Sequence, residues 1–347
     1  MNGGAYGAGS SPPGGTVFRI SATGSGYRVL HSFGNVQDGL QPSAVVDVNG
    51  TLYGTTLWGG DYNGGTVFSV STTGSNYRVL HTFVVGTPDG ANPAAGLVGV
   101  NGMLYGTTSF GGTSGSGTVF RISTEGTNYR VLHSFGGPGD GVSPEVSLVE
   151  VNGTLYGTTF SGGRYGTGAS SGTAFSVRTD GMKYRVLHSF GGTSDGKQPS
   201  PGPLVYVAGR LYGSTACGGA NGGGSGCTGG TIFSLTTKGK ERIVYSFPAT
   251  GAYEPTGIAG AQGTLYGITF EGGFGCCSGT VFTVGTNGQG FSVLHNFGKG
   301  SDGDQPYANP IYANGTLYGT TNCGGRYGAE NCASYNGRGG TVFALAP

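Results

Sequence analysis

The eight residues "NGTLYGTT" at positions 49–56 return unchanged at 152–159 and 314–321. Three related copies read "NGMLYGTT" at 101–108, "AGRLYGST" at 208–215 and "QGTLYGIT" at 262–269. An Asn-Gly pair ahead of an alternating apolar segment is a strong signal for a two-residue hairpin turn of type I′. Each copy therefore predicts a tight turn followed by a β-strand, and the recurrence predicts a chain built from tandem units.

A second motif gives the length of the unit. The threonine of "GT(V/A/I)F" falls at positions 16, 66, 118, 173, 231, 280 and 341, so successive units are 49 to 61 residues apart. Each unit carries four short β signals, named here strands a, b, c and d. In the first complete unit they lie at 43–48, 51–56, 65–71 and 77–83. Four strands in about 50 residues are typical of a β-propeller blade of the kelch size class.

The predicted fold class is an all-β β-propeller that forms a single domain over residues 1–347. A four-stranded sheet cannot bury both of its faces alone, whereas stacked blades bury each other's faces. We expect six blades, with the N-terminal strands in 15–33 closing the ring against the C-terminal strands in 307–346. The alternative is a seven-bladed parent with a truncated first blade. The glycine of "LYG" is expected to leave room for a neighbouring backbone.

The composition excludes several classes of function. Of 347 residues, 78 are Gly and only 10% are charged, with a formal net charge of +1. There is no basic stripe that would favour a nucleic-acid partner. No apolar run reaches the roughly 20 residues of a membrane-spanning helix. No H-E-x-x-H or phosphate-binding loop motif occurs, so we expect no cofactor, and the catalytic residues, if there are any, stay unknown.

The cysteines and the first residues indicate the cellular compartment. The opening "MNGGAYGAGSSPPGGTVF" resembles the middle of a repeat, so we expect that sequence upstream of Met1, including any signal peptide, is missing. The even number of cysteines and their placement in loops predict disulfides in an extracellular or cell-surface protein. We expect the pairs Cys217–Cys227 and Cys323–Cys332, and Cys276 and Cys277 are candidates for a vicinal disulfide. A metal site is the alternative, but no His is near these cysteines, so we expect none.

The combination of "LYGTT", "GG", "GTVF" and "LHSF" resembles the GloVer tandem repeat of bacterial exported proteins, often described as choice-of-anchor proteins. The resemblance covers essentially the whole chain, because the motif recurs in every unit. It implies a secreted or surface-exposed β-propeller. It carries over no activity and no catalytic residue.

Strand order predicts which end of the blades binds a ligand. The a–b and c–d turns lie at one end and are short and uniform, whereas the b–c and d–a loops lie at the other end. The b–c loops vary from "LWGGDYNG" at 57–64 to a much longer segment at 322–339. Variable loops on a repeated scaffold usually carry specificity, so we expect the b–c and d–a loops to form the binding face.

Two sets of repeated polar residues allow both a functional and a structural interpretation. Five carboxylates in "DG-x-x-P" motifs could form a cation-binding ring, but their recurrence favours a turn in which Asp bonds its own backbone and Gly takes a positive φ. These are Asp38, Asp89, Asp140, Asp195 and Asp302. Five histidines share a strand face with apolar residues, which predicts packing between blades. These are His31, His81, His133, His188 and His295.

Residues that interrupt the repetition are the better candidates for ligand contact. Aromatic rings next to a few charged groups suit carbohydrate stacking and hydrogen bonding. The candidates in the b–c loops are Trp58, Asp61, Tyr62, Arg164, Tyr165, Glu271, Arg326, Tyr327, Glu330 and Tyr335. The leading hypothesis is a binding or structural β-propeller for a polysaccharide or another surface protein. The alternatives are a carbohydrate-active hydrolase or lyase with acids in a central funnel, and a self-assembling surface protein. The oligomeric state is open.

Overall fold

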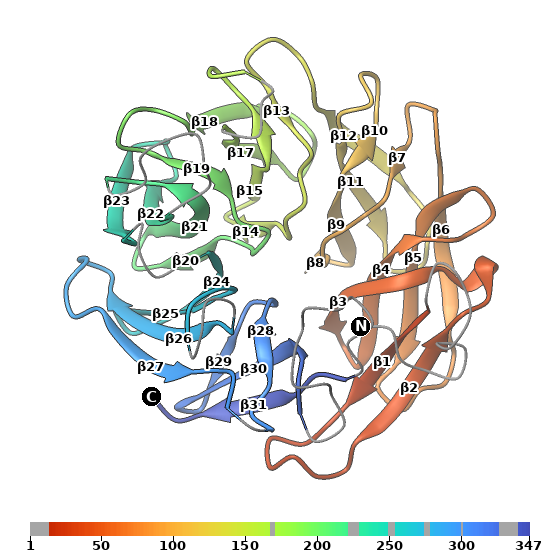
Figure 1. Cartoon of the computed structure of the whole chain (residues 1–347). Helices are drawn as coiled ribbons and strands as arrows, with labels where there is room; N and C mark the ends of the chain where they lie inside the picture. Colours follow the sequence, from red (N-terminus) through yellow and green to blue (C-terminus); the bar gives the residue numbers. More distant parts are fainter. Residues whose placement is uncertain are drawn as a thin grey trace. The chain divides into compact units, whose positions relative to one another are not determined.

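The structure is a computed structural model that describes residues 14–166, 171–220, 229–248, 254–273, 278–299, 301–325 and 339–347. Its elements are β-strands apart from the short 3₁₀ helix η1 (Val36–Asp38), as Figure 1 shows. Within the described ranges, no helix has the length and apolar character needed to cross a membrane. The chain divides into two compact units, residues 1–162 with 175–186 and residues 163–174 with 187–347.

The first unit contains a two-stranded sheet and two blades of four antiparallel strands. The small sheet pairs β1 (Gly15–Arg19) with β2 (Arg28–Phe33). The first blade has the order β3 (Leu40–Val48), β4 (Thr51–Trp58), β5 (Asn63–Ser71) and β6 (Arg78–Val84). The second has the order β8 (Val98–Val100), β9 (Met103–Thr108), β11 (Thr118–Ser123) and β12 (Arg130–Ser134).

The boundary between the units falls inside the third blade, and three further blades follow. The third blade contains β14 (Val149–Val151), β15 (Thr154–Thr159), β17 (Thr173–Arg178) and β18 (Arg185–Ser189). The fourth contains β20 (Val205–Val207), β21 (Arg210–Gly218), β22 (Thr231–Thr236) and β23 (Glu241–Ser246). The fifth contains β24 (Pro255–Ala261), β25 (Thr264–Thr269), β26 (Thr280–Gly285) and β27 (Ser292–Asn296). The sixth contains β28 (Asp304–Pro306), β29 (Ile311–Ala313), β30 (Thr316–Cys323) and β31 (Val342–Leu345).

The predicted fold class is therefore confirmed: the chain is a six-bladed β-propeller. In the described residues β2 pairs with β1, and β31 pairs with β30. Closure of residues 15–33 against 307–346 stays a prediction.

The hairpin turns predicted from "NG" are present in all six repeats. Asn49 and Gly50 have φ angles of 52° and 82°, the two positive values that a type I′ turn requires. Ala208 and Gln262 take the same left-handed conformation where the motif lacks Asn, with φ angles of 49° and 48°. The turn is therefore fixed by the strand pairing even where its first residue is unfavourable.

The prediction for the glycine of "LYG" was wrong in one respect. Gly106 lies opposite Phe120 in the β9–β11 ladder, and a Cβ atom on Gly106 would lie 2.6 Å from the Phe120 ring and 2.7 Å from Leu97. The space is thus filled by an aromatic side chain of the same blade and not by a neighbouring backbone. The other "LYG" glycines face the corresponding phenylalanine in the same way, namely Phe68, Phe175, Phe233, Phe282 and Phe343.

Each of these phenylalanines also contacts a phenylalanine at the end of strand d in the preceding repeat. Phe83 and Phe120 have ring centroids 5.2 Å apart at 68°, and both are fully buried. Edge-to-face pairs at this separation add about 0.5–1.5 kcal/mol to the hydrophobic gain of burial. The same pairing joins Phe33 with Phe68, Phe135 with Phe175, Phe190 with Phe233, Phe247 with Phe282, and Phe297 with Phe343. The core is therefore a series of similar clusters between successive blades.

We predict that Gly106→Ala lowers the free energy of unfolding by about 1–3 kcal/mol, because the added methyl group overpacks the Phe120 ring. The control is Gly137→Ala, since a Cβ atom at exposed Gly137 would make only an ordinary contact at 3.9 Å with Asp140. Urea unfolding of both variants checks this. Equal stability of the two variants would show that the ring adjusts without cost.

Candidate functional site

A pair of threonines fixes the point where each b–c loop begins. The Thr108 hydroxyl donates to the Phe110 carbonyl at 2.9 Å and lies 2.8 Å from the Thr118 hydroxyl. The Thr118 backbone N–H donates back to Thr108 Oγ1 at 3.1 Å. The same pair occurs as Thr56–Thr66, Thr215–Thr231, Thr269–Thr280 and Thr321–Thr341. The last threonine of "LYGTT" and the threonine of "GTVF" thus hold the loop in a constant position.

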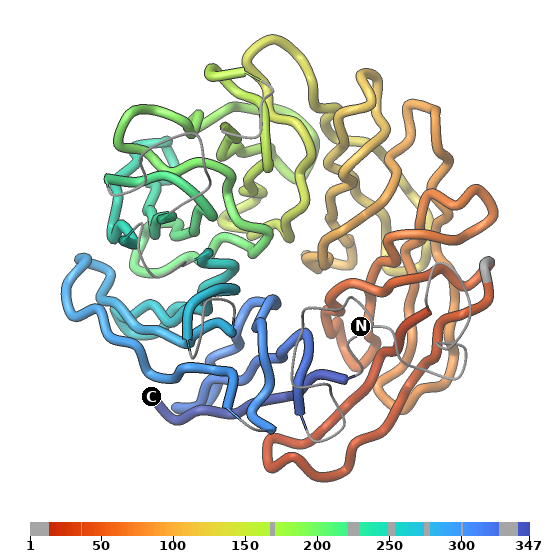
Figure 2. Tube along the Cα trace, in the orientation of Figure 1, coloured from red at the N-terminus to blue at the C-terminus, as the bar shows by residue number. Residues whose placement is uncertain are grey.

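The b–c loop of a blade pairs with the d–a loop that precedes the same blade. β7 (Gly90–Ala91) forms a short antiparallel ladder with β10 (Phe110–Gly111), and β13 (Gly141–Val142) does so with β16 (Ser161–Gly162). In the fourth blade β19 (Gly196–Pro199) pairs with the end of β21. The trace in Figure 2 shows the two loops of the second blade side by side. The two classes of loop predicted to share one face therefore lie next to each other.

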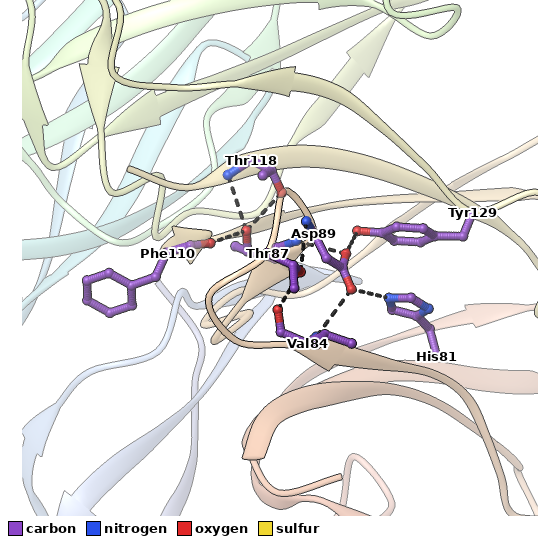
Figure 3. A network of polar contacts seen from close by, with 9 residues as sticks. His81, Val84, Thr87, Asp89, Phe110, Thr118 and Tyr129 are labelled. Carbon is purple, nitrogen blue, oxygen red and sulfur yellow. Dashed lines mark hydrogen bonds and ion pairs between the residues drawn. The ribbon is translucent and has the colours of Figure 1, made fainter. Parts of the chain in front are cut away.

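The carboxylate of Asp89 organises the d–a loop. Its Oδ2 atom accepts from the His81 ring and from the Val84 N–H, each at 3.2 Å, while Oδ1 accepts from the Gly90 N–H at 2.8 Å. The Tyr129 hydroxyl, which comes from the next blade, also donates to Oδ1 (Figure 3). The Tyr129 ring stacks on the His81 ring with centroids 3.9 Å apart. One half-buried anion is thus bonded to its own strand, to its own loop and to the next blade.

This His–Asp–Tyr arrangement recurs along the chain. His133 lies 2.9 Å from Asp140 and stacks on Tyr184 at 3.5 Å, and the Tyr184 hydroxyl donates to the Asp140 carboxylate. His188–Asp195 and His295–Asp302 are paired at 2.8 Å and 2.9 Å. In the first repeat the pair is looser: His31 and Asp38 are 3.5 Å apart, and the Tyr77 hydroxyl donates to the Asp38 backbone carbonyl.

The fifth repeat shows that the tyrosine hydroxyl and the aspartate carboxylate of this arrangement are lost together. Tyr245 replaces the histidine, the Asp-Gly pair is absent, and Phe291 stands where other repeats have the tyrosine. The Tyr245 and Phe291 rings still stack, with centroids 4.3 Å apart. The stack is therefore kept without the anion, and the hydroxyl is lost together with the carboxylate that it would bond.

The electrostatics of the network follow from these hydrogen bonds. Burial alone would raise the pKa of Asp89, but the bonds from His81 and Tyr129 outweigh it, and the pKa is lowered from its ordinary value. The pKa of Asp140 is lowered for the same reasons. Burial and the neighbouring carboxylate raise the pKa of Tyr129 well above its usual range. The aspartates are therefore held as anions and the tyrosine as a neutral donor.

The predicted turn chemistry of "DG-x-x-P" is only partly right. The aspartate does bond its own backbone, and Gly39 and Gly303 have positive φ angles of 96°. Gly90 does not have a positive φ angle, because it is extended in β7. Gly is required there since a Cβ atom would lie 2.4 Å from Thr108. The left-handed residue is instead the one before proline, as in Asn92 with a φ angle of 56°.

A cavity of about 570 Å³ lies against the Asp89 network. Residues 85–88 and 91–92 of the d–a loop line one side, and residues 110–113 with Gly115 of the b–c loop line the other. We call it the Phe110 cavity, because the ring of Phe110 is 53% exposed at its edge and points away from Asp89 in Figure 3. No charged side chain lines it. This combination suits a neutral ligand that stacks on an aromatic ring.

The predicted ligand-binding residues that the structure describes come from the b–c loops of the first, third and fifth blades. Trp58 is half-buried at the end of β4, whereas Asp61 is exposed and Tyr62 is 58% exposed in the same loop. Arg164 and Tyr165 are exposed in the loop of the third blade, and Glu271 is half-buried in that of the fifth. Arg326, Tyr327, Glu330 and Tyr335 lie outside the described residues. Ligand contact by these residues stays a prediction.

The predicted disulfides likewise stay predictions. Cys217 and Cys323 are buried, but Cys227, Cys332, Cys276 and Cys277 lie outside the described residues.

Phe110 was not among the predicted residues, although the sequence holds a signal for it. The residue before "GG" in each b–c loop varies where its neighbours repeat, and reads Trp58, Phe110, Ser161, Cys217, Glu271 and Cys323. Trp58 attracted notice as the single tryptophan, whereas Phe110 is one of 18 phenylalanines, most of which form the core.

The family model described as the Gloeobacter/Verrucomicrobia repeat matches residues 1–170 and 164–331. The chain belongs to this repeat family. The resemblance to the GloVer repeat is thereby confirmed. Comparison with the curated proteins finds no match.

The solved structures similar to this member of the repeat family include a nidogen/laminin complex and the tricorn protease. The first, from a crystal structure of a nidogen/laminin complex, has a TM-score of 0.49 and 14% identity, over 78% of this chain and 84% of that chain. The second, the tricorn protease, has a TM-score of 0.47 and 11% identity, over 80% of this chain and 25% of that chain.

We predict that the free energy of unfolding falls as the pH drops below about 4, the ordinary range of an aspartate. The folded-state pKa of Asp89 is lowered, so its contribution is present above the unfolded pKa and is lost as the pH falls through the folded pKa. Asp89→Asn should flatten this dependence, and Asp61→Asn, at an exposed position, should not. Urea unfolding between pH 2 and pH 6 (a range chosen to span the titration of aspartates) measures it. If the free energy of unfolding of Asp89→Asn fell with pH as steeply as that of wild type, Asp89 would not be the source of the pH dependence.

Proposed function

We propose that the chain is an exported binding protein that holds a neutral polysaccharide on its b–c loop face, with the Phe110 cavity as the main contact. The observation that carries the proposal is the exposed Phe110 ring beside a cavity without charged lining. A pyranose ring presents C–H groups that pack on an aromatic face, and its hydroxyl groups bond to backbone groups and to hydroxyls such as those of Thr87 and Thr113. An acidic glycan would find no cation in the lining.

The repeat architecture supports a binding role. The threonine pairs and the Asp89 network fix both loops at their bases, so the cavity is built on rigid elements while the loop residues vary. The predicted disulfides and the extracellular location belong to the same proposal.

We predict that Phe110→Ala weakens glycan binding by more than tenfold, since loss of a stacking ring costs about 1.4 kcal/mol or more. Wild type and variant are compared on an array that carries neutral and acidic glycans. The affinity of each protein for the glycans that bind is then measured by calorimetry. The control is Trp58→Ala, which removes the aromatic residue at the equivalent position of the preceding blade.

Unchanged binding by Phe110→Ala, or binding of acidic glycans alone, would contradict the proposal. Loss of binding in Trp58→Ala only would move the site to the first blade. Failure of wild type to bind any glycan would leave the protein-partner and self-assembly hypotheses.

A second candidate function is cleavage of a glycan, and one pair of acids favours it. Glu254 lies in the d–a loop of the fifth repeat, and its carbonyl accepts from the Phe270 N–H at 2.8 Å, next to Glu271. Burial and then the charge of Glu271 raise the pKa of Glu254. Glycosidases use one protonated and one ionised carboxyl group. Release of reducing ends by wild type, and its loss in Glu254→Gln, would support cleavage; no release by wild type would exclude it.

A further inference from the structure

The set formed by His188, Asp195 and Glu241 departs from the His–Asp–Tyr arrangement at a single residue. Glu241, at the start of β23, stands where Tyr77, Tyr129 and Tyr184 stand in other repeats, four residues before the histidine position. It faces the pair of His188 and Asp195 from the preceding repeat. A tyrosine at this position donates its hydroxyl to the aspartate, but an ionised glutamate can only accept. The substitution therefore places a second carboxylate beside the first.

The three side chains converge. The His188 Nε2 and Asp195 Oδ2 atoms are 2.8 Å apart, and one ligand atom from each of His188, Asp195 and Glu241 lies within 4.8 Å of the others. Among the described residues this is the one group of three such side chains. A tetrahedral zinc site with bonds of about 2.0–2.1 Å needs ligand atoms about 3.3 Å apart. Small side-chain movements would satisfy that spacing.

Independent support comes from one oxygen of the half-buried Glu241 side chain. Its Oε1 atom is shielded from solvent and has no hydrogen-bond partner among the described residues. The nearby Arg210 guanidinium is engaged elsewhere, with the Ser234 hydroxyl at 3.0 Å and the Lys240 carbonyl at 3.4 Å. A buried carboxylate oxygen without a partner costs free energy. A proton on Glu241 or a bound cation would remove this cost.

We propose that His188, Asp195 and Glu241 form a binding site for a divalent transition-metal ion. One imidazole nitrogen and two carboxylate oxygens suit Zn²⁺ or Mn²⁺. Asp195 Oδ1 remains bonded to the Gly196 N–H at 2.8 Å, so Oδ2 is the oxygen directed toward the metal position. The ion joins the end of β18 to the start of β23, the two segments that a tyrosine joins in the other repeats.

The rival is a proton on Glu241. Burial and then Asp195 raise its pKa, whereas His188 and Arg210 oppose the rise. A protonated Glu241 would donate to Asp195 as the tyrosine hydroxyl does. The two possibilities differ in whether the protein takes up metal.

The test uses the full chain, stripped with EDTA, dialysed and loaded with ZnCl₂ or MnCl₂. Bound metal per chain is measured by mass spectrometry, affinity by calorimetry and Tm by scanning calorimetry. Mn²⁺ is included because it prefers oxygen and imidazole ligands to thiolates. We expect one ion per wild-type chain and a higher Tm with metal. Glu241→Tyr installs the residue of the other repeats, and we expect it to fold, to bind metal more than tenfold more weakly and to have a metal-independent Tm.

The matched control is His133→Gln, which alters the equivalent histidine beside Asp140 and Tyr184 and should leave metal uptake unchanged. Wild type that takes up no more metal than Glu241→Tyr would overturn the proposal in favour of the proton. Loss of uptake in His133→Gln as large as in Glu241→Tyr would also overturn it, since the metal would then lie elsewhere.

Discussion

In the second and third repeats a single carboxylate connects the d–a loop with the blade that follows it. In the second repeat Asp89 accepts bonds from His81, from two backbone N–H groups and from Tyr129. Hydrogen bonds to an ionised group contribute about 1.5–3 kcal/mol each, roughly twice the value of neutral ones. The loop that carries Asp89 then pairs with the b–c loop and forms one side of the Phe110 cavity. The position of the candidate site therefore depends on this anion.

The Asp89 carboxylate can bond to the next blade because an apolar contact already holds the two blades in register. The Phe83–Phe120 pair packs against the stacked rings of His81 and Tyr129. The His81 ring contacts Phe83 edge-to-face, with centroids 4.7 Å apart. Gly106 makes room for Phe120, so the small residue of "LYG" and the large residue of "GTVF" act as one unit. The fifth repeat keeps the apolar part and loses the ionic part. The phenylalanine pair is thus kept from repeat to repeat, whereas the polar residues that pack against it vary.

The sequence predicted the blades well because their signals are local. Asn49 and Gly50 set a turn, and the alternation in "GTVFSVS" sets a strand with two faces. The His–Asp–Tyr contact was missed because Tyr129 meets Asp89 across 40 residues, and only the packing of neighbouring blades shows that they touch. A trace of it is nevertheless present: each histidine is followed seven or eight residues later by its aspartate, and the fifth repeat lacks both. The roles of Glu241 and Phe110 likewise become apparent only when each residue is compared with the residues at the equivalent position of the other repeats.

The most direct test of this account is a double-mutant cycle between Asp89→Asn and Tyr129→Phe, with stability measured by urea unfolding at neutral pH. Both changes are nearly isosteric, so the cycle isolates the bond between the hydroxyl and the carboxylate. We predict a coupling free energy of about 1–2 kcal/mol, in the range of hydrogen bonds to charged groups. Additive effects, with a coupling below about 0.3 kcal/mol, would show that the carboxylate does not join the two blades.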